Sequence, residues 1–229
     1  SRCDARVRRD PLVPGMASWD SERGVWVGDA AAGAGEEPLP DPLLVYGYAS
    51  LVWKVDPLFD SFPRAAALAL GFRRRMRQRS MDHRGVPGLP GLVATLVPDS
   101  DASVAGVVYL IPEEHREEVL RGLDHRERGG YSRQVINVRL LSPLPTATPP
   151  TRALAYLGLQ DNPNLALDVP PGEAAATIAA AHGPSGPNDG YLLPLAAFVR
   201  SVGAEEEEQE VLQLEAAVRA LKGLPPAGG

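Results

Sequence analysis

Short apolar segments separated by turn-forming residues run from residue 43 to residue 159, and they restrict the fold more than any other feature. Most are joined by short connections, with one helix between them. Pro98 to Asp101 give a turn signal between the third segment and the fourth. Short strands at this spacing favour a mainly antiparallel sheet that is closed or nearly closed. The expected strands are 43–53, 65–78, 92–97, 104–111, 134–140 and 152–159.

Beyond residue 160 the sequence becomes helical. Helices are expected over 171–182, from Asn188 or Asp189 through Arg200, and after the acidic run 205–208. The acids are interpreted as a solvated helix start, and the apolar side chains of the last helix as core contacts. The fold class is therefore α+β, with a mainly antiparallel sheet that is closed or nearly closed and helices after it. The apolar positions of the last helix are Val211, Leu214, Val218 and Leu221.

Length and composition indicate one globular domain. With 229 residues, of which 44% are hydrophobic, the chain can bury one good core. Residues 28–42 contain almost no large apolar side chain, so they cannot offset the entropy of ordering. We therefore expect a disordered or weakly ordered leader over 1–41, a globular domain over 42–223 and a flexible tail over 224–229. Met16 is a plausible natural start within the leader.

Several function classes are disfavoured by charge and residue usage. A net charge of -6 and a pI near 5.3 argue against nucleic-acid or anionic-membrane binding, and no apolar run approaches transmembrane length. Cys3 is the only cysteine, so a reducing compartment fits best and we expect the cytoplasm; the arginine-rich leader leaves an organellar transit peptide as the alternative. Neither metal-ligand spacing nor a nucleotide-binding fingerprint is present, so no metal or cofactor is expected.

A carboxylate-bearing turn stands out at residues 123–131, Leu-Asp-His-Arg-Glu-Arg-Gly-Gly-Tyr. It lies between an amphipathic helix and a strand, and Gly129 and Gly130 mark where the backbone reverses. Glu127, two residues before that break, would be fixed by the helix end and free to face a cleft. On spacing alone, a solvated helix terminus with Glu127 between two arginines is the favoured alternative.

Two further stretches could bind an anion. The small residues that follow the strand starting at Leu43 can leave backbone N–H groups open as a donor nest, although such residues more often mark a bulge or tight packing. Between Arg64 and Arg84 there are seven arginines and one acid, which suits a carboxylate ligand, although most are expected on the solvent face of a strand. The Gly- and Pro-rich loop 82–91 is a candidate wall of a site.

Five stretches together resemble the ChaC family of glutathione-specific γ-glutamylcyclotransferases. They occur in the family's order and spacing, and the resemblance extends over about 44–221. The stretches are 45–53, 82–88, 123–131, 161–164 and 183–188.

The resemblance implies a γ-glutamylcyclotransferase fold, which is a small, mainly antiparallel β-barrel flanked by helices, and a cofactor-free reaction that converts glutathione to 5-oxoproline and cysteinylglycine. No obligatory protein partner is expected. It assigns the general base to Glu127 and a second glutamate to Glu118. The substrate-binding turn corresponds to Tyr48, Ala49, Ser50 and Leu51. Arg84 and Tyr131 are further substrate-binding candidates, with core packing the competing role for Tyr131.

Ala49 departs from the family pattern, which usually has glycine there. Alanine would cost about 1 kcal/mol or more if the position needs a positive φ, and would narrow specificity or weaken binding if it only lies near the substrate. Two alternatives therefore stay open: a cyclotransferase for other γ-glutamyl amino acids or amines, and a catalytically weak binding or regulatory member of the fold.

Overall fold

The computed structural model describes residues 38–55, 57–126, 131–146, 148–158, 162 and 164–228, with the side chains of 125 and 126 excepted, and the backbone of 18–20 and 25–27. Within the expected leader, strands β1 (Ser18–Asp20) and β2 (Val25–Val27) pair antiparallel.

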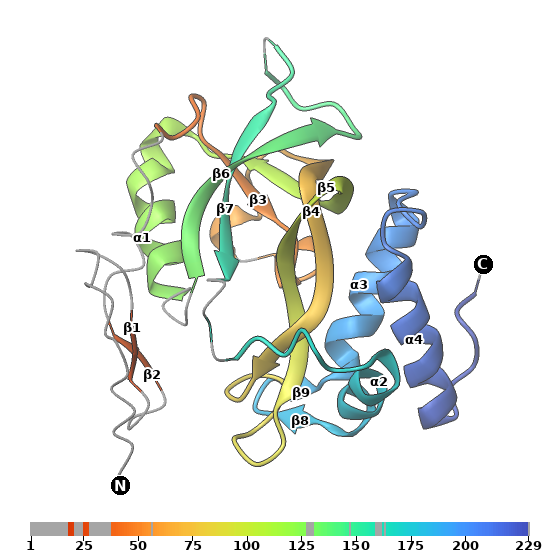
Figure 1. Cartoon of the computed structure of the whole chain (residues 1–229). Coiled ribbons are helices and arrows are strands. Elements are labelled where there is room, and N and C mark those ends of the chain that lie inside the picture. Colours follow the sequence, from red (N-terminus) through yellow and green to blue (C-terminus); the bar gives the residue numbers. More distant parts are fainter. Residues whose placement is uncertain are drawn as a thin grey trace, which may run out of the picture.

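A closed barrel of five strands forms the centre of the protein, in the order β3-β5-β4-β6-β7 (Figure 1). Its pairs are antiparallel except β3 with β7, which run parallel. The mainly antiparallel barrel predicted from the sequence is thus confirmed. The strands are β3 (Leu44–Gly47), β4 (Arg64–Ser80), β5 (Gly91–Leu110), β6 (Tyr131–Leu140) and β7 (Arg152–Gly158).

The expected turn at Pro98 to Asp101 lies inside one long strand, β5, so the sequence prediction of two strands here is wrong. Both halves pair with β4, and the register shifts where Leu70 opposes Ser103 and Phe72 opposes Pro98. The extra residues of β5 bulge from the ladder opposite Gly71, which takes a φ of 81°. The turn signal therefore marks an irregularity within β5 and not its end. The strand continues because β4 pairs with β5 both before and after these residues.

Helices cover two sides of the barrel. Figure 1 shows α1 on one side, and α2, α3 and α4 together beside the long β4–β5 hairpin. Strand β3 and the residue before it divide their side chains between two apolar clusters: Leu44 and Tyr46 join the one that reaches α2 to α4, and Leu43 and Val45 join the one under α1. The helices are α1 (Arg116–Arg126), α2 (Pro171–Ala180), α3 (Asp189–Ser201) and α4 (Gln209–Lys222), with short 3₁₀ helices η2 (Ser50–Val52), η3 (Pro57–Phe59) and η4 (Glu113–His115), and a small ladder of β8 (His182–Gly183) with β9 (Gly186–Pro187).

Two expectations for the helical half are wrong in detail. Asn188 stands at the N-cap position of α3, but its side chain makes no cap hydrogen bond and instead bonds both the N–H (2.6 Å) and the C=O (2.8 Å) of Leu92. In α4, Val211, Leu214 and Val218 are buried as expected, whereas Leu221 is 59% exposed because it lies in the last turn.

Charged side chains expected at the surface are also buried. Arg74 and Arg77 on β4 are 2% and 0% exposed, and Glu208, at the end of the acidic run, is 3% exposed. Arg74 pairs with Glu208 at 3.1 Å, and Arg77 pairs with Glu210 at 3.0 Å. The arginines therefore face α4, which covers this part of β4, and their counter-charges are Glu208, the last acid of the run, for Arg74 and Glu210, in the first turn of α4, for Arg77.

Candidate active site

Three strand ends meet at one end of the barrel. Because β3 runs parallel to β7, with Val45 opposite Leu154, both strands finish at the same end. Because β6 runs antiparallel to β7, with Tyr131 opposite Gly158, it begins there. In Figure 1 this is the lower end of the barrel, where the β7 arrow points. The turn that follows β3 and Tyr131, the first residue of β6, thus lie at the same end of the barrel.

The turn that follows β3 has a well-defined backbone. The carbonyl of Ser50 accepts hydrogen bonds from Trp53 N (3.2 Å) and Lys54 N (2.7 Å), and the carbonyl of Leu51 accepts one from the hydroxyl of Tyr109 (2.7 Å). Ala49 has φ of -113° and ψ of -136°, so this position does not require a positive φ. A cost of alanine at position 49 that arises from a required positive φ therefore does not apply to this chain.

Gly47, the last residue of β3, is required by close packing. A Cβ atom there would lie 2.7 Å from Cβ of Leu51, closer than real Cβ contacts come. The absence of a side chain lets the turn fold back against the strand end, which brings Leu51 over Gly47. Tight packing between Gly47 and Leu51 therefore explains one of the small residues that follow the start of this strand in the sequence.

The proposed base, Glu127, lies outside the described residues. The described chain reaches Arg126 at the end of α1 and resumes at Tyr131, the first residue of β6. Tyr131 packs against the cluster under α1. Arg126 and Tyr131, the described residues on either side of 127–130, thus belong to α1 and β6, whose positions beside and in the barrel are defined.

A polar network ties α1 to the strands beside it. The carboxylate of Asp124 accepts hydrogen bonds from Arg133 Nε (2.7 Å), from Arg133 Nη2 and from the hydroxyl of Tyr156 (2.7 Å). Arg133 on β6 and Tyr156 on β7 are direct cross-strand partners. Burial, followed by the hydrogen bond to Asp124, raises the pKa of Tyr156 above its usual value, so this hydroxyl remains a donor at neutral pH.

The same network reaches the turn after β3. The hydroxyl of Tyr48, which is 5% exposed, donates a hydrogen bond to the carbonyl of Tyr156 at 3.0 Å. Sequence reasoning missed Asp124, Arg133 and Tyr156. The only signal for them was an opposite-charge pair, Asp124 and Arg133, placed on either side of the Gly-Gly turn.

Arg84 joins the site from another side. Its Nη1 donates to the carbonyl of Pro187 at 3.1 Å, and its guanidinium lies 6.0 Å from the ring centre of Tyr191. The Tyr191 ring in turn makes an edge contact with Trp53, 4.9 Å between ring centres. The expected wall loop 82–91 is thus connected, through α3, to the end of the turn that contains Tyr48 to Leu51.

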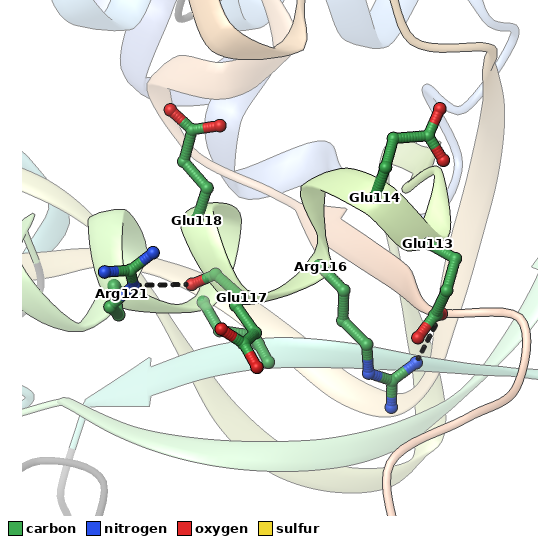
Figure 2. Close-up of a pocket in the computed structure, with 7 residues that line it drawn as sticks. Glu113, Glu114, Arg116, Glu117, Glu118 and Arg121 are labelled. Carbon is green, nitrogen blue, oxygen red and sulfur yellow. Dashed lines mark hydrogen bonds and ion pairs between the residues drawn. The ribbon is translucent and has the colours of Figure 1, made fainter.

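Glu118 lies apart from these contacts. Its side chain is 61% exposed, and its carboxylate is 3.5 Å from Nδ1 of His115. It lines a surface hollow on α1 and points to the same side as Glu114, away from Glu117 and Arg116 (Figure 2). The structure therefore places Leu51 and Tyr131 against one apolar cluster and links Arg84 to the turn only through Tyr191 and Trp53, and the roles of these residues and of Glu118 stay predictions.

Two kinds of feature are absent from the residues that the structure describes. No group of three or more His, Cys, Asp or Glu side chains there could hold a metal ion. None of the described helices combines the length and apolar character needed to cross a bilayer.

Comparison with known proteins places the chain in a family. A family model described as ChaC-like protein matches residues 43–221. A Danio rerio protein named glutathione-specific gamma-glutamylcyclotransferase 1 is 35% identical over 180 residues, which cover 78% of this chain and 89% of that protein. A Homo sapiens protein of the same name is 35% identical over 182 residues, covering 78% and 79%.

The fold has a solved counterpart. The crystal structure of a yeast γ-glutamyl cyclotransferase specific to glutathione superposes with a TM-score of 0.67 at 30% identity, over 78% of this chain and 96% of the other. The family model extends from the residue before β3 to the last turn of α4, so it includes the whole barrel. The chain belongs to the ChaC-like family.

Proposed function

We propose that this protein is a glutathione-specific γ-glutamylcyclotransferase, which converts glutathione to 5-oxoproline and cysteinylglycine. The observation that carries the proposal is the 35% identity over 180 residues to the Danio rerio protein of that name, 89% of which is covered. The yeast structure with the same stated specificity, at a TM-score of 0.67, supports it.

The reaction takes place within one substrate molecule. The α-amine of the glutamyl group attacks its γ-carbonyl carbon, the bond from that carbon to the cysteine nitrogen breaks, and one proton passes from the attacking nitrogen to the leaving nitrogen. Attack within one molecule removes much of the entropic barrier if the glutamyl group is held in a folded conformation. No redox or group-carrying cofactor is needed, and none is proposed.

Glu127 is the proposed general base and acid that carries this proton. General acid–base catalysis of this kind contributes about 10² to 10⁴-fold in rate. The turn from Tyr48 to Leu51 binds the glutamyl group through backbone N–H groups, and its closely packed backbone holds those donors in place. Arg84 and Tyr131 are proposed to contact the substrate, and Glu118 to assist Glu127.

The test replaces Glu127 with glutamine and measures cysteinylglycine release from glutathione. We expect Glu127→Gln to lower kcat by about 10² to 10⁴-fold with an unchanged circular dichroism spectrum, because the amide cannot carry the proton. Glu114→Gln, an exposed carboxylate on the same side of α1 as Glu118, is the matched control and retains full kcat. Glu118→Gln lowers kcat less than Glu127→Gln. An unchanged rate for Glu127→Gln removes Glu127 from this role.

A substrate panel separates the alternatives. Purified protein is assayed on glutathione and on γ-glutamyl-alanine side by side, with 5-oxoproline as the common product. Turnover of glutathione alone supports the proposal, and equal turnover of both indicates a broader γ-glutamyl enzyme. Binding of glutathione without turnover of either compound indicates a binding or regulatory protein.

The cellular setting is also a proposal. The single cysteine, Cys3, and the net charge of -6 favour a reducing compartment and no affinity for nucleic acid or anionic membranes. We propose the cytoplasm. Fluorescence microscopy of the tagged full chain tests this, and an organellar signal would favour a transit peptide in the leader.

A further inference from the structure

A partly buried polar junction lies at the end of α1, the helix that precedes the proposed base in the sequence. Asp124 is in the last turn of α1, three residues before Glu127, and Arg133 is in β6, two residues after Tyr131. The Asp124–Arg133 pair therefore bridges the connection 127–130 from its two ends. The side chains of Arg133 and Asp124 are 17% and 23% exposed, so the pair is shielded from most of the solvent.

The Asp124–Arg133 pair joins α1 to β6 through two hydrogen bonds. Both carboxylate oxygens of Asp124 accept from Arg133, one from Nε and the other from Nη2, in a two-pronged arrangement that fixes the relative orientation of α1 and β6. The Tyr156 hydroxyl adds a bond from β7, and Arg133 Nη2 also donates to the carbonyl of Leu120 at 3.5 Å. Since its oxygens are already bonded to Arg133 and Tyr156, Asp124 is poorly placed to take a proton from the substrate.

Tyr156 extends this support to the substrate turn. Its side chain bonds Asp124, and its main-chain carbonyl accepts from the hydroxyl of Tyr48. One residue of β7 is therefore bonded both to the helix that leads into Glu127 and to the first residue of the turn 48–51. A shift of α1 relative to that turn would break these bonds.

We propose that Asp124, Arg133 and Tyr156 are positioning residues that fix the last turn of α1, which leads into Glu127, relative to the substrate turn formed by Tyr48 to Leu51. The inference rests on the proposed function and deepens it. A misplacement of about 1 Å in a catalytic group can lower a rate by about 10²-fold, which is the scale of effect that loss of this support should have.

The experiment compares Asp124→Asn and Tyr156→Phe with the wild type and with Glu215→Gln as the matched control. Glu215 on α4 accepts from Arg200 of α3 (2.5 Å) and from Arg219 of α4 itself (2.9 Å), is 1% exposed and takes no part in the proposed site. Like Asp124, it is a carboxylate bonded by arginine, so the control measures the loss of stability that such a change causes by itself.

The expected result is a split between kcat and KM. Asp124→Asn lowers kcat for glutathione by about 10 to 100-fold with KM within about threefold of the wild type. Tyr156→Phe, which leaves the Arg133 pair in place, lowers kcat less. Glu215→Gln lowers the melting temperature at least as much as Asp124→Asn but retains kcat. The acidic limb of the pH profile stays in place in Asp124→Asn, because the base itself is unchanged.

Four outcomes would overturn the inference. If both site variants retain kcat within twofold, or if Glu215→Gln loses as much kcat as Asp124→Asn, the junction is only structural. If the acidic limb disappears in Asp124→Asn, Asp124 is itself the base. A wild-type protein that releases no cysteinylglycine overturns the proposed function and this inference together, whereas an active wild type with unaffected variants overturns this inference alone.

Discussion

At the scale of single residues, Ala49 is the position in the substrate turn where this chain departs from the family pattern. Its φ of -113° is one that any residue adopts. None of the described residues other than glycine has a positive φ, so alanine at position 49 introduces no backbone strain. The Ala49 methyl group therefore acts through its packing against the apolar cluster and through contact with the substrate, and not through backbone strain.

We expect Ala49→Gly to lower the free energy of unfolding by about 0.4 to 1 kcal/mol. Glycine makes the unfolded chain more flexible, and the folded backbone gains nothing from it. Urea denaturation of the two proteins measures the difference. A more stable glycine variant would show that the turn is strained by alanine after all.

The residues around the site differ in how visible they are in the sequence. The turn 48–51 and Arg84 belong to continuous motifs, so a family resemblance is enough to point to them. Asp124, Arg133 and Tyr156 come from a helix and two strands, and only the register that places Arg133 opposite Tyr156 brings them together. Such contacts depend on tertiary pairing, which spacing along the chain does not reveal.

At the scale of elements, the attachment of α4 to the β4–β5 hairpin rests on a buried ion pair. Arg74 Nη2 lies 3.1 Å from Glu208 Oε1, and the same oxygen accepts from Ala105 N at 2.9 Å. Burial raises the pKa of Glu208, and the charge of Arg74 opposes that shift. Nε and Nη1 of Arg74 have no hydrogen-bond partner within the described part of the chain, so Glu208 supplies the main compensation for this buried charge.

A double-mutant cycle should show this dependence. Glu208→Leu alone leaves the guanidinium buried without a counter-charge and should lower the free energy of unfolding by about 3 to 5 kcal/mol. Arg74→Met with Glu208→Leu should lose less than the sum of the two single changes, with a coupling of about 1 to 3 kcal/mol, measured by urea denaturation. Additive effects would mean that the pair contributes little to holding α4.

The sequence predicted the residue ranges of helices and strands better than it predicted which elements pack against one another. Apolar patterning located β4, β6, β7, α2, α3 and α4, because each carries its own local signal. It divided β5 in two, because a proline beside two aspartates marks a bulge and a turn equally well. It also assigned most arginines of β4 to solvent, since the helix that covers Arg74 and Arg77 lies more than a hundred residues further along the chain.

For the molecule as a whole, closure of the barrel creates the site. The ends of β3 and β7 lie at the same end of the barrel as the start of β6. This arrangement depends on the parallel pairing of β3 with β7. The pairing brings together segments from near residue 47 and near residue 131, which no local signal relates. The site is thus a property of strand order, while its individual residues belong to short motifs.

The part of the chain that carries the function can be tested by truncation. The family model matches residues 43–221, and the described contacts reach slightly beyond it: Leu39 packs against the cluster under α1, and Arg219 Nη1 donates to the carbonyl of Pro225 at 2.9 Å. We expect a protein of residues 38–226 to retain kcat for glutathione within twofold and a melting temperature within about 3 °C of the full chain, a shift that corresponds to about 1 kcal/mol at this size.

A second truncation, residues 44–226, makes this test specific. It removes Leu43, which is 1% exposed and whose carbonyl accepts from Ile111 N at 2.9 Å. Loss of one fully buried leucine side chain removes about 1.5 to 3 kcal/mol, so its melting temperature should fall by about 3 to 12 °C. Thermal melts and glutathione assays on the three proteins decide the matter. If residues 38–226 melt as early as 44–226, or lose activity, then residues 1–37 contribute to the folded domain and its boundary lies nearer the first residue.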